Sequence, residues 1–158
     1  MMKKEGKYRL LERQVAALLE GEQDTVAKMA NVAAVVHETF GFWWTGFYRV
    51  ASHCHSGLDP ESGELILGPF QGPVACMHIP YGKGVCGTAW ARNETVVVPD
   101  VEAFPGHIAC SSASRSEIVV PVHGLDGAVV AVLDIDSDKP ATFDDIDKEW
   151  LEKIVKLL

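Results

Sequence analysis

Apolar side chains recur at helical spacing over the first quarter of the chain. In residues 8–21, YRLLERQVAALLEG, they lie three or four positions apart, and a glycine ends the run. Residues 24–41, DTVAKMANVAAVVHETFG, show the same spacing, opened by Asp24 or Thr25 and again ended by glycine. The pattern predicts two amphipathic helices. The apolar positions of the first are Leu10, Leu11, Val15, Leu18 and Leu19.

The middle of the chain changes to short runs of β-branched and aromatic residues separated by turn-forming residues. Such runs predict strands; the first two should pair as a hairpin, and the turn GLDGA should join the last two as another. The run GKGVCGTAWARN predicts a short helix after a glycine turn. The expected strands are 43–50, 65–70, 75–81, 95–101, 117–124 and 128–137, the short helix is 82–93, and the loops are 52–64 and 103–116.

A third amphipathic pattern ends the chain in residues 142–158, TFDDIDKEWLEKIVKLL, with Thr142 as the expected cap. Its inner face is expected to consist of Ile146, Trp150, Ile154, Val155 and Leu158. Helices at both ends and antiparallel strands between them are typical of an α+β fold, here in a single domain of residues 1–158. We therefore expect the terminal helices to cover one face of the sheet and leave the other face for a different purpose.

Alternation along the strands assigns side chains to these two faces, because residues two apart share a face. Asp134 and Asp136 therefore point away from their aliphatic neighbours, and Glu117 does the same on the preceding strand. In the first strand Gly46 lies between two aromatic residues of the same face, which suggests room for a guest molecule. The second face is expected to carry Trp44, Tyr48, Glu117, Asp134 and Asp136. The alternative is that the acidic residues simply face water, as on many antiparallel sheets.

Composition and charge restrict the class of partner. Hydrophobic residues make up 47% of the chain and charged residues 23%, as in ordinary globular proteins. The net charge of −8, without any cluster of Lys or Arg, argues against nucleic acid and against anionic membranes. Neither a signal peptide nor a bilayer-spanning segment is recognisable, so we expect a cytoplasmic protein.

The chain has four cysteines, Cys54, Cys76, Cys86 and Cys110. In a chain of this size and expected location, catalytic, redox or buried thiols are more typical than a disulfide framework. The apolar run around Cys86 indicates a buried thiol. The histidines on either side of Cys54, and His78 two residues after Cys76, lack the ligand spacing of zinc sites, so no metal centre is expected.

Cys110 has a different setting, in the polar loop HIACSSASRSE that leads into Glu117 and a buried strand. A thiol with the usual pKa of about 8.5 is mostly protonated at neutral pH, and nearby carboxylates favour that form further. Crowded carboxyl groups cannot all ionise, so one can act as a general acid while another binds a cation. Reduction of an amino-acid sulfoxide would use a thiol, a proton donor and an ammonium site together, although other thiol reactions also fit these residues.

Four stretches of the chain carry a family resemblance: GFYRV, LGPFQGPVACMHIPYGKGVCGTAW, VPDVEAFPGHIACSSASRSEIVVPV and VLDIDSD. They resemble the free methionine-(R)-sulfoxide reductases, which are built on a GAF domain, from about Trp44 to the C-terminus. The resemblance is specific, because a generic GAF domain lacks the three cysteines spaced by 10 and 24 residues. It implies a GAF-like antiparallel sheet with the terminal helices on one face and a ligand pocket on the other.

The resemblance also implies a reaction and its partners. Cys110 corresponds to the nucleophile, Cys76 to the main resolving thiol, and Cys86 to a third cysteine of secondary role. The substrate is free L-methionine (R)-sulfoxide, reduced through a sulfenic acid and an intramolecular disulfide. Thioredoxin is the expected external reductant, with no resident cofactor, and a homodimer is the expected assembly.

The same resemblance assigns the remaining site residues. Glu117, Asp134 and Asp136 correspond to the carboxylates that bind and protonate the substrate, with the proton on Glu117, on Asp136 or shared. Trp44 and Tyr48 correspond to an aromatic wall for the S-methyl group.

One segment departs from the family pattern. The loop at residues 52–64 is longer than the expected hairpin, so we interpret it as a surface insertion, and Cys54 has no family counterpart. Two other functions use some of the same features: a GAF sensor that binds a small molecule unchanged, and a thiol-based peroxide sensor. The first lacks an output domain in this chain, and the second has no need of a carboxylate cluster.

Overall fold

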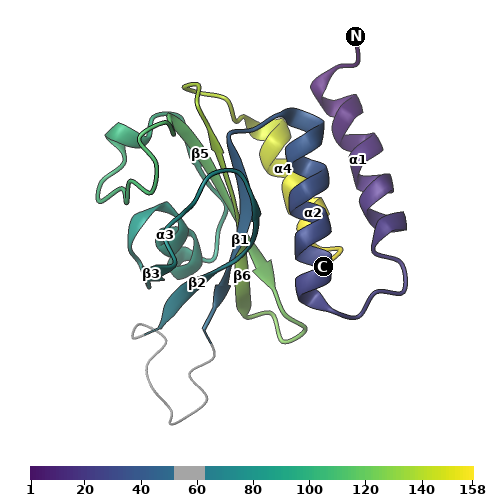
Figure 1. Ribbon diagram of the computed structural model, residues 1–158, viewed down its shortest axis with the longest axis horizontal. Helices are drawn as coiled ribbons and strands as arrows, with labels where there is room; N and C mark the ends of the chain where they lie inside the picture. The colour runs from purple at the N-terminus through teal and green to yellow at the C-terminus, as the bar shows by residue number, and fades with distance from the viewer. Residues whose placement is uncertain (52–62) are drawn as a thin grey trace.

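The computed structural model describes residues 1–51 and 63–158 (Figure 1). The elements in chain order are α1 (Lys4–Leu18), α2 (Thr25–Phe40), β1 (Trp44–Val50), β2 (Glu64–Gln71), β3 (His78–Pro80), α3 (Gly84–Arg92), β4 (Val96–Val98), the 3-10 helix η2 (Val101–Ala103), β5 (Ser116–His123), β6 (Val129–Ser137) and α4 (Asp145–Val155). The strands form one sheet in the order β3-β2-β1-β6-β5-β4, with every neighbouring pair antiparallel. The predicted α+β fold and both predicted hairpins are confirmed.

One face of the sheet is covered by helices, as expected. Figure 1 shows α2 and α4 against this face and α1 outside them, where it contacts both. The sheet contributes aliphatic and aromatic side chains to this layer, and Phe47, Ile118, Leu133 and Ile135 are all fully buried in it. Removal of such side chains from water is the main favourable term in folding, so burial in this layer stabilises the fold.

Hydrogen-bonded caps set the helix ends. Asp24 accepts a backbone N–H in the first turn of α2, and Gly41 ends that helix in the left-handed conformation with φ 67°, both as predicted. The predicted cap of the last helix, Thr142, is wrong. Asp144 caps α4 instead, in a capping box with Asp147, because its carboxylate reaches two backbone N–H groups of the first turn.

The predicted inner face of the last helix is partly wrong, and the apolar pattern of the first helix is only partly buried. Leu10 and Leu18 of α1 are each 47% exposed, and Ile146 of α4 is 37% exposed. Each helix buries a narrower stripe than its full apolar pattern, because only one side of it meets other elements. The buried apolar residues are Tyr8, Leu11 and Val15 in α1, with Leu19 just beyond it, and Trp150, Leu151, Ile154 and Val155 in α4.

The opposite face of the sheet is also buried. Helix α3 contacts β5 and β6 on this side, and a second apolar cluster forms around Trp44, Tyr48 and Val119. Glu117 and Asp134 are each only 6% exposed. The alternative that these acidic side chains face water is therefore wrong. None of the helices in the described part of the chain is long and apolar enough to span a membrane.

The expected room beside Gly46 is filled by its neighbours. A methyl group at this position would lie 2.4 Å from Phe70 Cβ and 2.5 Å from the far edge of the Trp44 ring. The two rings stack with centroids 5.3 Å apart. Glycine at this position allows the indole to fold over its own strand, and the space for a ligand lies elsewhere.

We predict that Gly46→Ala lowers the free energy of unfolding by about 1–3 kcal/mol, because the added methyl group overpacks a rigid aromatic contact. Urea denaturation followed by circular dichroism measures the change. Gly6→Ala is the matched control, since its methyl group would meet only the flexible end of Met2, 2.9 Å away. Equal stability of Gly46→Ala and the parent protein would contradict this account of the packing.

Candidate active site

Three carboxylates meet on the second face of the sheet because of the strand register. Asp136 of β6 pairs with Trp44 of β1 on one side and with Glu117 of β5 on the other. Asp134, two residues earlier, pairs with Gly46 and so shares the face of Asp136. The register thus places three acidic side chains beside one another, as the alternation of the strands predicted.

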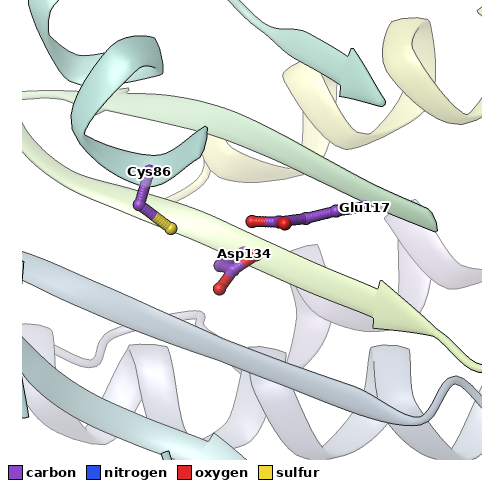
Figure 2. Close-up of side chains that lie close together, drawn as sticks. All are labelled: Cys86, Glu117 and Asp134. Atoms are coloured by element: carbon purple, nitrogen blue, oxygen red, sulfur yellow. The ribbon is translucent and has the colours of Figure 1, made fainter. Parts of the chain in front are cut away.

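Helix α3 completes this group with a thiol. In Figure 2, Cys86 points from α3 toward Asp134, and the carboxyl group of Glu117 extends toward the same place. The thiol and the two carboxyl groups offer ligand atoms that lie within 4.8 Å of one another, and Cys86 is only 3% exposed. Oδ1 of Asp134 is buried and has no hydrogen-bond partner among the described residues.

A thiol and two carboxyl groups at this separation are the donor types of a zinc site. Among residues 1–51 and 63–158, Cys86, Glu117 and Asp134 form the one group of His, Cys, Asp or Glu side chains whose ligand atoms lie close enough together to hold a metal ion. The expectation of an enzyme without a metal remains a prediction. The tripeptide 53–55, considered above as a weak metal motif, and Cys54 with it, lie outside the described residues.

Burial changes the protonation of the whole cluster. It raises the pKa of Glu117 and of Asp134 well above the usual values, and the charge of Asp136 raises both further. The pKa of Asp136 rises to about 6, because burial outweighs the opposing hydrogen bond from Ser114 and charge of His107. These shifts agree with the expectation that crowded carboxyl groups hold a proton near neutral pH. Burial, followed by the nearby acidic charges, likewise raises the pKa of the Cys86 thiol.

Two cysteines distant in sequence are joined beside this cluster. Cys76 and Cys110 form a disulfide across 34 residues, with Cα atoms 5.5 Å apart. Cys76 lies between β2 and β3 and is half-buried, whereas Cys110 is exposed in the loop between η2 and β5. The requirement that these two thiols lie within disulfide reach is confirmed.

The two predicted aromatic residues hold the segment that carries Cys76. The indole Nε1 of Trp44 donates to the carbonyl of Pro73 at 3.0 Å, and the Tyr48 hydroxyl donates to the carbonyl of Cys76 at 2.9 Å. Their rings stack with centroids 5.9 Å apart. Burial raises the pKa of Tyr48, so its hydroxyl remains a hydrogen-bond donor at neutral pH. The aromatic pair therefore anchors this part of the backbone as well as forming a wall.

A cavity of about 580 Å³, part of which is open to solvent, brings the predicted residues together. The predicted residues that line it are Trp44, Tyr48, Cys86, Cys110, Glu117, Asp134 and Asp136. The remaining predicted residue, Cys76, is joined to this set through its bond to Cys110.

Two polar residues of the cavity that lie beside the carboxyl groups were missed by the sequence analysis. Ser114 donates a hydrogen bond of 2.5 Å to Asp136, and Nε2 of His107 lies 3.6 Å from Oε2 of Glu117. His107 belongs to the stretch PGHIAC, which carried part of the family resemblance and was a usable signal. Ser114 is one of several serines in its loop, and no pattern distinguishes it.

The chain matches known proteins over almost its whole length. The GAF domain family model matches residues 22–158. The free methionine-R-sulfoxide reductase of Escherichia coli is 43% identical over 96% of this chain and 86% of its own length. The chain belongs to the GAF-domain family of free methionine-R-sulfoxide reductases. It is an oxidoreductase, as the resemblance implied.

Two further proteins extend this match. GAF domain-containing protein A of Dictyostelium discoideum is 52% identical over 98% of this chain and 92% of its own length. The X-ray structure of free methionine-R-sulfoxide reductase from Neisseria meningitidis, in complex with its substrate, is 49% identical with a TM-score of 0.89. The match covers 99% of this chain and 89% of that one. Family membership thus extends through the elements that build the cavity.

The carboxyl cluster predicts how stability depends on pH. Folding raises the pKa of Asp136 from the usual 3.8 to about 6. Its contribution to stability is therefore complete below pH 4 and is lost as the pH rises through about 6. We expect the free energy of unfolding of the parent protein to fall as the pH rises over this range. In Asp136→Asn the slope should be shallower, by up to about 1.4 kcal/mol per pH unit. Urea titrations between pH 4 and pH 7 measure both slopes, and parallel curves would refute the assignment.

Proposed function

We propose that this protein reduces free L-methionine (R)-sulfoxide to methionine, with Cys110 as nucleophile and Cys76 as resolving thiol. The observation that carries the proposal is a bond between these two sulfur atoms beside a cavity lined with buried carboxyl groups. The bonded form corresponds to the product state of the reaction. The substrate named for the E. coli and N. meningitidis relatives supports the same assignment.

The proposed reaction transfers one oxygen atom and two electrons. The sulfur of Cys110 attacks the sulfoxide, the S–O bond of the substrate breaks, and the oxygen ends as the hydroxyl group of a sulfenic acid on Cys110. Methionine leaves with its sulfur reduced. The thiol of Cys76 then condenses with the sulfenic acid, which forms the disulfide and releases water.

The carboxyl cluster supplies the proton that this step needs. A protonated Glu117 or Asp136, or the two sharing a proton, donates to the sulfoxide oxygen as the S–O bond breaks, and the proton lost by the Cys110 thiol restores the carboxyl group. An ionised neighbour, including Asp134, binds the ammonium group of the free amino acid, and Trp44 and Tyr48 receive the S-methyl group. Selection of the free amino acid follows from this arrangement, because a residue within a protein has no ammonium group there.

Cys86 has a different role in this scheme. Its raised pKa and its burial keep the thiol protonated, so it is a poor nucleophile compared with Cys110. It shapes the acidic end of the cavity in the proposed mechanism. Thioredoxin returns the Cys76–Cys110 disulfide to two thiols, so the enzyme needs no resident cofactor. A cytoplasmic location and a homodimer remain predictions.

Single-turnover experiments test the two cysteine roles. Cys110→Ser should form no methionine from the R sulfoxide, because the attacking sulfur is absent. Cys76→Ser should still form about one equivalent of methionine per protein and then stop with thioredoxin as reductant, because the sulfenic acid is not resolved. Methionine release from the R and S epimers, with free thiols counted in parallel, measures both effects. Full activity of Cys110→Ser with dithiothreitol would eliminate the mechanism.

Glu117→Gln separates sulfoxide reduction from peroxide sensing. The substitution keeps the shape of the side chain and removes its acidic proton, so sulfoxide reduction should slow by about 100-fold or more. Oxidation of Cys110 by hydrogen peroxide needs no such donor and should continue at the parental rate. Loss of both reactions together would indicate a damaged site and would count against a proton-transfer role for Glu117.

A further inference from the structure

Two apolar side chains flank the disulfide without being buried. Val74 is 87% exposed and Met77 is 69% exposed, on either side of Cys76 in the segment that joins β2 to β3. Single exposed apolar residues are common on protein surfaces. These two are distinguished by their position, because they lie next to a bond that, in the function proposed above, is reduced from outside in every cycle.

The backbone that presents these side chains is held in place. Trp44 and Tyr48 donate to the carbonyls of Pro73 and Cys76, and the carbonyl of Met77 accepts from the backbone N–H of Leu67 at 2.9 Å. A surface fixed in this way loses little conformational entropy on binding, so exposed apolar area on it contributes more fully to affinity.

The surroundings of the two sulfur atoms differ. Cys110 is the more exposed of the two, but its neighbours in the chain, Ala109, Ser111 and Ser112, are small and mostly polar and offer little apolar area. A partner that gains affinity from apolar contact therefore approaches from the side of Cys76, over Met77 and Val74.

We propose that Val74 and Met77 form the docking surface for the protein dithiol that reduces this enzyme, and that the partner attacks the sulfur of Cys76. The proposal rests on the function proposed above and specifies how its last step is carried out. The partner that this surface would select is a dithiol protein with apolar side chains beside its reactive thiol, because Val74 and Met77 offer apolar contact beside Cys76.

The chemistry is a thiol–disulfide exchange in two steps. The partner's thiolate attacks Sγ of Cys76, the Cys76–Cys110 bond breaks, and Cys110 leaves as a thiolate that takes a proton from water. The partner's second thiolate then attacks the mixed disulfide and releases Cys76. The partner's dithiol is oxidised by two electrons, and both enzyme thiols are regenerated.

Reduction kinetics test the docking surface. We expect Met77→Ser to lower kcat/KM for thioredoxin about fivefold to tenfold, because it removes most of one exposed apolar contact. Turnover of the same variant with dithiothreitol should be unchanged, since a small reductant needs no docking. Leu125→Ser is the matched control: Leu125 is fully exposed in the β5–β6 turn, at the end of these strands opposite to Glu117 and Asp136. Equal effects of the two substitutions on kcat/KM for thioredoxin would overturn the proposal.

Trapping experiments test which sulfur is attacked. Thioredoxin with its second cysteine replaced by serine should form a mixed disulfide with the oxidised enzyme, and peptide mapping should locate it at Cys76. A mixed disulfide at Cys110 would overturn this part of the proposal. The other candidate for this surface is a second copy of the protein, and sedimentation of the oxidised protein tests it. A dimer that Met77→Ser dissociates would assign the surface to the second copy and would overturn the docking role.

These measurements separate the inference from the function on which it rests. Reduction of methionine sulfoxide with dithiothreitol reports on the proposed function alone. Docking alone is tested by the rate at which thioredoxin reduces the Cys76–Cys110 disulfide in the absence of sulfoxide. NADPH consumption in the presence of thioredoxin reductase measures this rate. Each can fail while the other holds.

Discussion

Burial of a cluster of three acidic side chains on one face of the sheet is the constraint on which the rest of this structure depends. An isolated ionised carboxylate in apolar surroundings is strongly unfavourable, and three together repel one another as well. Glu117, Asp134 and Asp136 nevertheless lie on adjacent strands beneath helix α3. The cluster is tolerable only with protons retained and a few polar partners, such as the hydroxyl of Ser114. These conditions also suit proton transfer to a substrate.

The two faces of the sheet divide stability from chemistry. The helix-covered face is closed by apolar packing, which favours folding. The other face has its own apolar cluster, but it surrounds a cavity and carboxyl groups whose pKa values are raised. A fold with a single buried face would have little stability left to accommodate such a group. Here the apolar packing on the helix-covered face offsets the unfavourable burial of carboxyl groups on the other face.

The thiols of the described residues differ in reactivity because of their surroundings. Cys86 is enclosed beside two carboxyl groups and is kept protonated, whereas Cys76 and Cys110 lie nearer the surface and are bonded to each other. The spacing of Cys76, Cys86 and Cys110 in the sequence does not show which of the three thiols is the most reactive. Trp44 and Tyr48 contribute to the difference, because their hydrogen bonds hold the segment of Cys76 beside the loop of Cys110.

The sequence by itself determined the features that depend on a few neighbouring residues. Alternation placed Asp134 and Asp136 on one face, Asp24 and Gly41 marked the ends of α2, and the spacing of three cysteines identified the family. Such signals are readable because side-chain direction and helix capping are decided within about one turn or two strand residues.

Only the tertiary structure decided which of these elements meet. The register that pairs Glu117 with Asp136, the contact of Cys76 with Cys110 across 34 residues, and the filled space beside Gly46 all depend on how distant segments pack. The same holds for Ser114 and His107, whose roles arise from loops folded onto the sheet. Local pattern carries no information about such distances, because strand pairing and loop closure are settled by the packing of the whole domain.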